Sequence, residues 1–170
     1  MPNIVGAGII PAHKSYRRQK NIKEEPMNVT QLSAFVSNKP GHLQKVLKVL
    51  ADENINIITL TIAETVDFGI LRMIVNDAEK GYKALKDKNI TAQVTDVLAL
   101  EINDTPGSLY KALDVFAKMN LNIEYMYAFS EKRQGKAVMI FRFEDIEAAV
   151  AALKENGYNI INKIDIIGEN

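Results

Sequence analysis

Two short segments carry the same residue types at the same spacing, and they are the strongest candidates for binding chemistry. The first is Asn38-Lys-Pro-Gly-His-Leu43, and the second, offset by 66 positions, is Asp104-Thr-Pro-Gly-Ser-Leu109. Each precedes a helical pattern, and a helix N-terminus presents free N–H groups and a positive partial charge. Because glycine leaves these groups uncovered, both turns are suited to bind an anion such as a carboxylate.

A purely structural role would also account for the residues of the two turns. Asn38 or Asp104 would cap the helix, and the proline would set its first turn. Glycine would then serve only close packing. A duplication would copy such a cap as readily as a binding site, so both explanations stay open at this stage.

Other residues capable of catalysis or metal binding are few. The chain has no cysteine and only two histidines, His13 and His42, which excludes disulfides, thiolate metal sites and cysteine nucleophiles. It contains no G-x-S-x-G, H-E-x-x-H, P-loop or G-x-G-x-x-G motif. Acidic residues near strand ends, such as Glu101 and Asp104, form no pair that suggests acid–base chemistry. We expect no enzyme activity, no metal site and no cofactor.

The elements that position the two turns are themselves repeated. Between Asn38 and Ile57, ten of twenty positions are identical to those 66 residues later, including the lysines at 45 and 111. In each copy, an alternating strand pattern precedes the turn and an i, i+3, i+4, i+7 apolar pattern follows it. Two strands, a second helix and a final strand complete each unit. The order βαββαβ predicts two α+β domains of the ferredoxin-like class, each an antiparallel sheet with two helices on one face.

The predicted boundaries follow from this repeat. Residues 1–26 have no counterpart in it and are expected to be a loosely ordered, mildly basic tail. The first domain is predicted at 27–96 and the second at 97–170, and the last strand of the first runs into the first strand of the second near Asp96-Val97. No Gly/Pro/Ser linker separates the domains, so we expect them to pack together.

Composition narrows the function further. The 170 residues carry 21 Lys+Arg and 21 Asp+Glu, and this zero net charge argues against a dedicated nucleic-acid binder. No apolar run approaches the roughly 18 residues of a membrane helix. The tail lacks the charge order of a secretory signal, so we expect a cytoplasmic protein with neither nucleic-acid nor membrane partners.

The repeated βαββαβ order and the N/D-x-P-G-x-L turns over residues 29–167 resemble the ACT domain in its tandem form. The resemblance implies a non-catalytic regulatory protein that binds a free amino acid or similar small metabolite between side-by-side domains. It also implies regulation of a separate metabolic enzyme in trans, since no catalytic domain is recognised here, and a possible homodimer. The ligand-binding residues that it implies are Asn38, Pro40, Gly41, His42, Leu43, Asp104, Pro106, Gly107, Ser108 and Leu109 in the turns, with Thr59, Thr61, Tyr125 and Tyr127 from the second strands.

Two alternatives belong to other function classes. The RNA-recognition motif has the same element order, and Gly135-Lys-Ala-Val-Met-Ile-Phe141 faintly resembles its third strand, although the base-stacking aromatics are replaced there. A purely structural assembly module that pairs edge strands would bind no small molecule.

Overall fold

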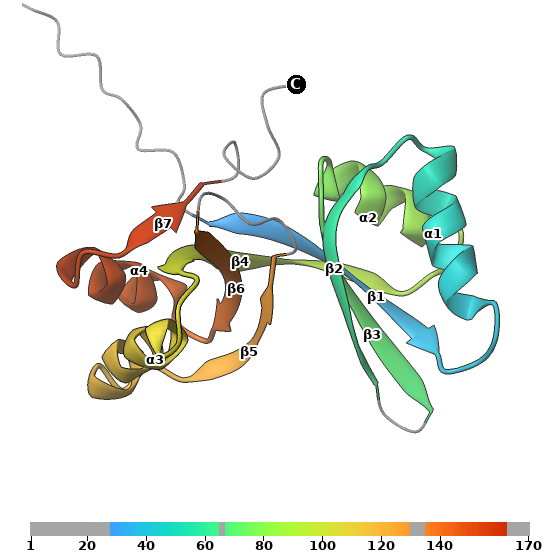
Figure 1. Ribbon diagram of the computed structural model, residues 1–170. Coiled ribbons are helices and arrows are strands. Elements are labelled where there is room, and N and C mark those ends of the chain that lie inside the picture. The colour runs from blue at the N-terminus through green and yellow to red at the C-terminus, as the bar shows by residue number, and fades with distance from the viewer. Residues whose placement is uncertain (1–27, 65–66, 130–134, 163–170) are drawn as a thin grey trace, which may run out of the picture.

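The computed structural model describes residues 28–64, 67–129 and 135–162, and its elements follow the predicted βαββαβ order twice (Figure 1). The predicted tail at 1–26 lies outside the described residues. The elements of copy one are β1 (Val29–Ser37), α1 (His42–Asp52), β2 (Ile57–Glu64), β3 (Phe68–Val75) and α2 (Ala78–Asp87). Strand β4 (Ala92–Asn103) serves both copies, and copy two continues with α3 (Ser108–Lys118), β5 (Ile123–Ala128), β6 (Lys136–Phe143), α4 (Ile146–Glu155) and β7 (Asn159–Ile161).

Strand β4 joins the two copies. The sequence predicts a final strand for copy one and a first strand for copy two that meet near Asp96-Val97, and the structure merges them into one strand of 12 residues. Residues 92–97 pair with β1, whereas residues 98–103 pair with β6. The resulting order β2-β3-β1-β4-β6-β5, with β7 also on β4, is antiparallel throughout. The two lobes seen in Figure 1 therefore share one continuous sheet.

Each pair of helices covers its own apolar core. In copy one, Leu32 and Leu71 project from the strands towards Val46 and Leu50 of α1. In copy two, the corresponding core is aromatic, and it contains three phenylalanines in mutual contact, Phe116, Phe141 and Phe143, with ring centroids 4.9–5.9 Å apart. Leu32, Ala34 and Val36 alternate along β1 towards the helices, whereas residues 97–100 of β4 are buried in succession because both faces of that strand are covered.

A third core lies between the faces of the two copies that carry no helices. Val29 and Ile74 of copy one pack there with Tyr127, Val138 and Ile140 of copy two. The two copies therefore contact each other through their helix-free faces as well as through β4. Among the described residues, no helix has the length and apolar content needed to cross a membrane.

Candidate functional site

The two Pro-Gly turns have the same geometry. Helix α1 begins at His42 and α3 at Ser108, and the preceding residues, Gly41 and Gly107, are the N-caps with φ of 83° and 86°. Glycine is favoured in this left-handed region because it lacks a Cβ. The predicted capping by Asn38 and Asp104 is wrong, because the chain makes a further turn before the helix starts.

The turn residues ahead of the helix are held by the backbone instead. The Asn38 N–H donates to the Asp67 carbonyl (3.0 Å), and the Asp104 N–H donates to the Gly135 carbonyl (2.9 Å). Pro40 and Pro106 also precede the helix and do not lie in its first turn. Close packing does not explain the glycines either, since a Cβ at Gly41 or Gly107 would meet nothing within 4 Å. Backbone conformation is the reason for glycine at both positions.

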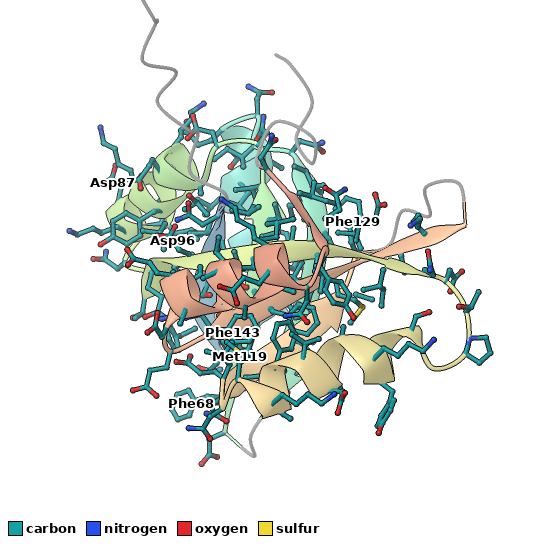
Figure 2. All side chains as sticks on the ribbon, turned by 90° about the vertical axis from the view of Figure 1, so that its left-hand side faces the viewer. Phe68, Asp87, Asp96, Met119, Phe129 and Phe143 are labelled. Carbon is teal, nitrogen blue, oxygen red and sulfur yellow. The ribbon has the colours of Figure 1, made fainter. Side chains whose placement is uncertain are left out.

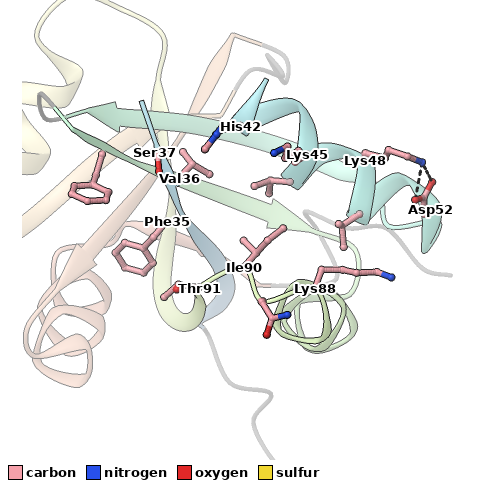
Figure 3. Close-up of a pocket in the computed structure, with 14 residues that line it drawn as sticks. Phe35, Val36, Ser37, His42, Lys45, Lys48, Asp52, Lys88, Ile90 and Thr91 are labelled. Atoms are coloured by element: carbon pink, nitrogen blue, oxygen red, sulfur yellow. Dashed lines mark hydrogen bonds and ion pairs between the residues drawn. The ribbon is translucent and has the colours of Figure 1, made fainter. Parts of the chain in front are cut away.

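A cleft of about 630 Å³ adjoins the first turn. The end of β1 forms its floor, α1 forms one wall, and the loop between α2 and β4 forms the other (Figure 3). This space exists because β4 starts at Ala92, which pairs with Ala34, so that the last residues of β1 extend past their neighbour. Val36, Val49 and Ile90 make its lining apolar on the side of α1, and Phe35 and Phe68 line it on the other side of the sheet edge.

The charges around the copy-one cleft are mostly positive. Lys45, Lys48 and Lys88 line it with His42, and Asp52 provides the only carboxylate among the described residues of its lining. Lys48 Nζ lies 2.8 and 2.9 Å from the two Asp52 carboxylate oxygens, so this acid is already paired. Within the described residues, Lys45 and Lys88 form no ion pair.

Free amide groups add to this positive character at the start of α1. The first bond inside the helix runs from the Lys45 N–H to the Gly41 carbonyl (3.1 Å). The amides of Leu43 and Gln44 precede that bond, and they have no backbone acceptor in the described part of the chain. The cleft therefore combines an apolar lining with an electropositive end, which suits a small anion that has an apolar body.

Copy two has a cleft of about 370 Å³ at the corresponding place. The end of β4, the start of α3 and the loop between α4 and β7 form it, so the same three segments are used in both copies. Its lining is polar, with Glu101, Ser108, Lys111 and Lys136 among the side chains. Lys136 Nζ lies 3.7 Å from a Glu101 carboxylate oxygen.

Of the ten turn residues predicted to bind ligand, only two line these clefts. His42 lines the first and Ser108 the second. Ser108 Oγ lies 2.8 Å from Thr105 Oγ1, which also belongs to the second turn. The other eight are neighbours of the clefts in the turns, and their ligand contacts stay a prediction.

The structure brings the four predicted second-strand residues to another place. Thr59, Tyr125 and Tyr127 lie on the helix-free faces where the copies meet, and Thr61 pairs with Arg72 on the same sheet. None of the four lines either cleft. Their predicted role in binding a ligand stays a prediction.

Gln31 of copy one links the two tyrosines. Its amide nitrogen donates to the Tyr125 hydroxyl (2.8 Å), and its amide oxygen accepts from the Tyr127 hydroxyl (2.9 Å). The Arg72 guanidinium lies 4.0 Å from the centre of the Tyr125 ring. Burial raises the pKa of the Tyr127 hydroxyl well above its usual value of 10, so it keeps its proton and donates even where an exposed tyrosine would begin to ionise. This cluster fixes how the two copies sit against each other.

Sequence reasoning missed most of the residues that line the clefts. Lys45 and Lys111 were visible as polar identities between the repeats, on helices whose other matches are largely apolar. Phe35, Phe68 and the loop at 88–91 carried no such signal, because only the sheet topology brings them together. In the described ranges, no group of His, Cys, Asp and Glu is placed to hold a metal ion.

Comparison with known proteins agrees with this architecture. A family model described as an ACT domain pair matches residues 27–169, so the chain belongs to that family. Protein BT0572 from Bacteroides thetaiotaomicron is similar in structure, with a TM-score of 0.78 and 40% identity, covering 84% of this chain and 98% of that chain. No curated protein matches the chain.

Two crystal structures of regulatory subunits of aspartate kinase share the fold. Those from Thermus thermophilus (ligand-free form) and Thermus flavus are each 19% identical to this chain, with TM-scores of 0.55. The alignments cover 75% and 76% of this chain and 92% and 93% of theirs. The tandem α+β arrangement predicted from the repeat is thereby confirmed.

Proposed function

We propose that this protein is a non-catalytic regulatory protein that binds a free amino acid or similar small carboxylate beside its Pro-Gly turns. In this proposal it acts in trans on a separate metabolic enzyme. The observation that carries the proposal is the repetition of a cleft next to each turn, with an equivalent lysine in both. A cap that had only a structural role would not require a cleft and a lysine at both copies.

The similarity to regulatory subunits of aspartate kinase supports action on a separate enzyme, because those subunits are themselves named as regulators of an enzyme. The clefts offer recognition rather than catalysis. They contain lysines, amides and apolar side chains, and in the described part of the chain the hydroxyl of Ser108 is bonded to another alcohol, that of Thr105, rather than to a base.

The packing of the helix-free faces favours this proposal over RNA binding. An RNA-recognition module stacks bases on aromatic side chains that its sheet exposes. Here Val138 and Ile140 of that face are buried against copy one, and the side chain of Phe141 lies in the core under α3 and α4. The surface that RNA would need is occupied by the other copy.

A thermal-shift screen of the twenty amino acids and of matching carboxylates without an amino group tests the proposal. A ligand at about 100 times its Kd stabilises the native state by ~2.7 kcal/mol, which raises Tm by several degrees. His42→Ala and Ser108→Ala form a matched pair, because each removes one side chain from one cleft. Each should reduce the ligand-induced shift of its own cleft and leave the Tm of the free protein nearly unchanged. If no small carboxylate moves the transition at millimolar concentration, the structural assembly module becomes the better explanation.

A further inference from the structure

The two clefts differ at one pair of equivalent positions. Copy one has Phe35 on β1 and Phe68 on β3, whereas copy two has Glu101 and Lys136 at the corresponding positions of β4 and β6. The phenylalanines are 37% and 60% exposed, and Phe68 projects from the edge of the molecule (Figure 2). An aromatic pair in one cleft thus occupies the place of an ion pair in the other.

This exchange decides whether an ammonium group finds a partner. Within the ranges that the structure describes, Asp52 is the only carboxylate that lines the copy-one cleft, and both of its oxygens are bound by Lys48. Lys45 and Lys88 would repel a second cation. In copy two, the Glu101 carboxylate lies in the cleft and its partner Lys136 is 3.7 Å away, a distance that leaves the carboxylate able to accept a further donor.

We propose that the copy-one cleft binds small carboxylic acids that have an aromatic or branched apolar body and no ammonium group. A zwitterionic amino acid is instead matched by copy two, where Lys111 and Glu101 offer one partner for each of its charges. This inference rests on the proposed function, that small carboxylates bind beside the turns, and it assigns a different ligand class to each cleft.

The expected difference in Kd between the two ligand classes follows from the free-energy cost of an unpaired charge. A charged group that loses its hydrogen bonds to water and gains no partner weakens binding by roughly ten-fold or more. Phe35, Phe68 and Ile90 offer no acceptor for an ammonium group. The carboxylate of either kind of ligand has the same partner in the copy-one cleft, Lys45, so the ammonium group alone makes the difference.

Calorimetry with 3-phenylpropanoate and L-phenylalanine tests this directly, because the two probes differ only by the amino group. For the full-length protein, we expect 3-phenylpropanoate to bind the copy-one cleft at least ten-fold more tightly than L-phenylalanine does. Lys45→Met should raise the Kd of 3-phenylpropanoate by about ten-fold, because the ligand carboxylate loses its partner. The matched control, Lys111→Met in the other cleft, should leave that Kd within about three-fold.

A second test exchanges one residue between the copies. Phe35→Glu introduces the residue that copy two has at this position. It should weaken the binding of 3-phenylpropanoate and strengthen that of L-phenylalanine, so that the order of their affinities is reversed. Phe35→Leu keeps the position apolar and should preserve the original order. If Phe35→Glu does not fold, as judged by its circular dichroism, Phe35→Leu with Lys45→Met still decides the site.

The outcomes separate this inference from the proposed function. Equal or tighter binding of L-phenylalanine at a Lys45-dependent site overturns the inference, and so does an absence of 3-phenylpropanoate binding while other carboxylates bind. In both cases the proposed function survives. If no small carboxylate binds at all, both proposals fail together.

Discussion

Helices α1 and α3 begin in the same way, after a left-handed glycine, and the fourth residue of each is a lysine that lines a cleft. Around this common frame the side chains diverge. Phe35 and Phe68 in copy one correspond to Glu101 and Lys136 in copy two, and Gln31 on the helix-free face corresponds to Val97. Different residues therefore set the backbone of the turn and the chemistry of the cleft, so the cleft can change while the turn stays the same.

The largest expected change in the free energy of unfolding comes from substitutions in the two cores, which differ in composition. Phe116 of copy two corresponds to Leu50 of copy one, and both are buried completely or almost so. We expect Phe116→Ala to lower the free energy of unfolding by about 4 kcal/mol and Leu50→Ala by about 3 kcal/mol. Urea unfolding measures both, and Tyr110→Ala on the same helix as Phe116, at a position 72% exposed, should change little. A loss below ~1 kcal/mol for Phe116→Ala would contradict the aromatic core.

The second test concerns the polar contact between the copies. Gln31→Val places the copy-two residue in copy one and leaves the hydroxyls of Tyr125 and Tyr127 without their partner. This should lower the free energy of unfolding by about 2 kcal/mol, because one buried and one half-buried hydroxyl lose their hydrogen bonds. Gln93→Val, at an exposed position on β4, is the control. In a double-mutant cycle, Tyr127→Phe should cost less in the Gln31→Val background than in the wild type, and strict additivity would rule out the coupling.

The same contact predicts sensitivity to alkali. The pKa of Tyr127 is raised in the folded state by burial, so the unfolded chain ionises first as pH rises past about 10. The stability due to the neutral phenol is complete below pH ~10 and then falls by up to about 1.4 kcal/mol per pH unit. Urea unfolding at several pH values should show a steeper loss above pH 10 for the wild type than for Tyr127→Phe. Parallel curves would exclude Tyr127 as the source.

The smallest expected change in the free energy of unfolding comes from exchanging equivalent residues of α2 and α4. Gly81 in α2 corresponds to Ala149 in α4, and Ala149→Gly should cost about 1 kcal/mol of helix stability. Gly81→Ala should not bring the same gain, since its Cβ would lie 2.8 Å from Leu32 Cδ2. Leu32→Val removes that carbon, and in this background Gly81→Ala should become stabilising relative to Leu32→Val alone. A gain of about 1 kcal/mol in the wild type would mean that Leu32 moves aside freely.

The fold could be predicted from the sequence largely because the repeat reveals its own boundaries. Periodicity located the helices and strands, and the lack of a linker indicated that strands meet near Asp96-Val97. The start of α1 was misjudged because Asn before Pro-Gly is typical of a cap, whereas the positive φ of Gly41 depends on a turn that local sequence does not determine. The cleft residues Phe35 and Phe68 could not be inferred, because their proximity follows from where β4 stops pairing with β1.

The shared strand β4 has a consequence for dissecting the protein. In most tandem proteins a cut in the linker separates the domains, but here the repeat boundary falls within a strand. A cut after Asp96 would remove Val97 from its pairing with Val29 and separate the two partners of the third core. Either half made alone would present an apolar sheet face and a broken strand end to the solvent. Expression of single copies should therefore yield aggregating fragments, and we expect the whole pair to be the smallest unit that folds stably.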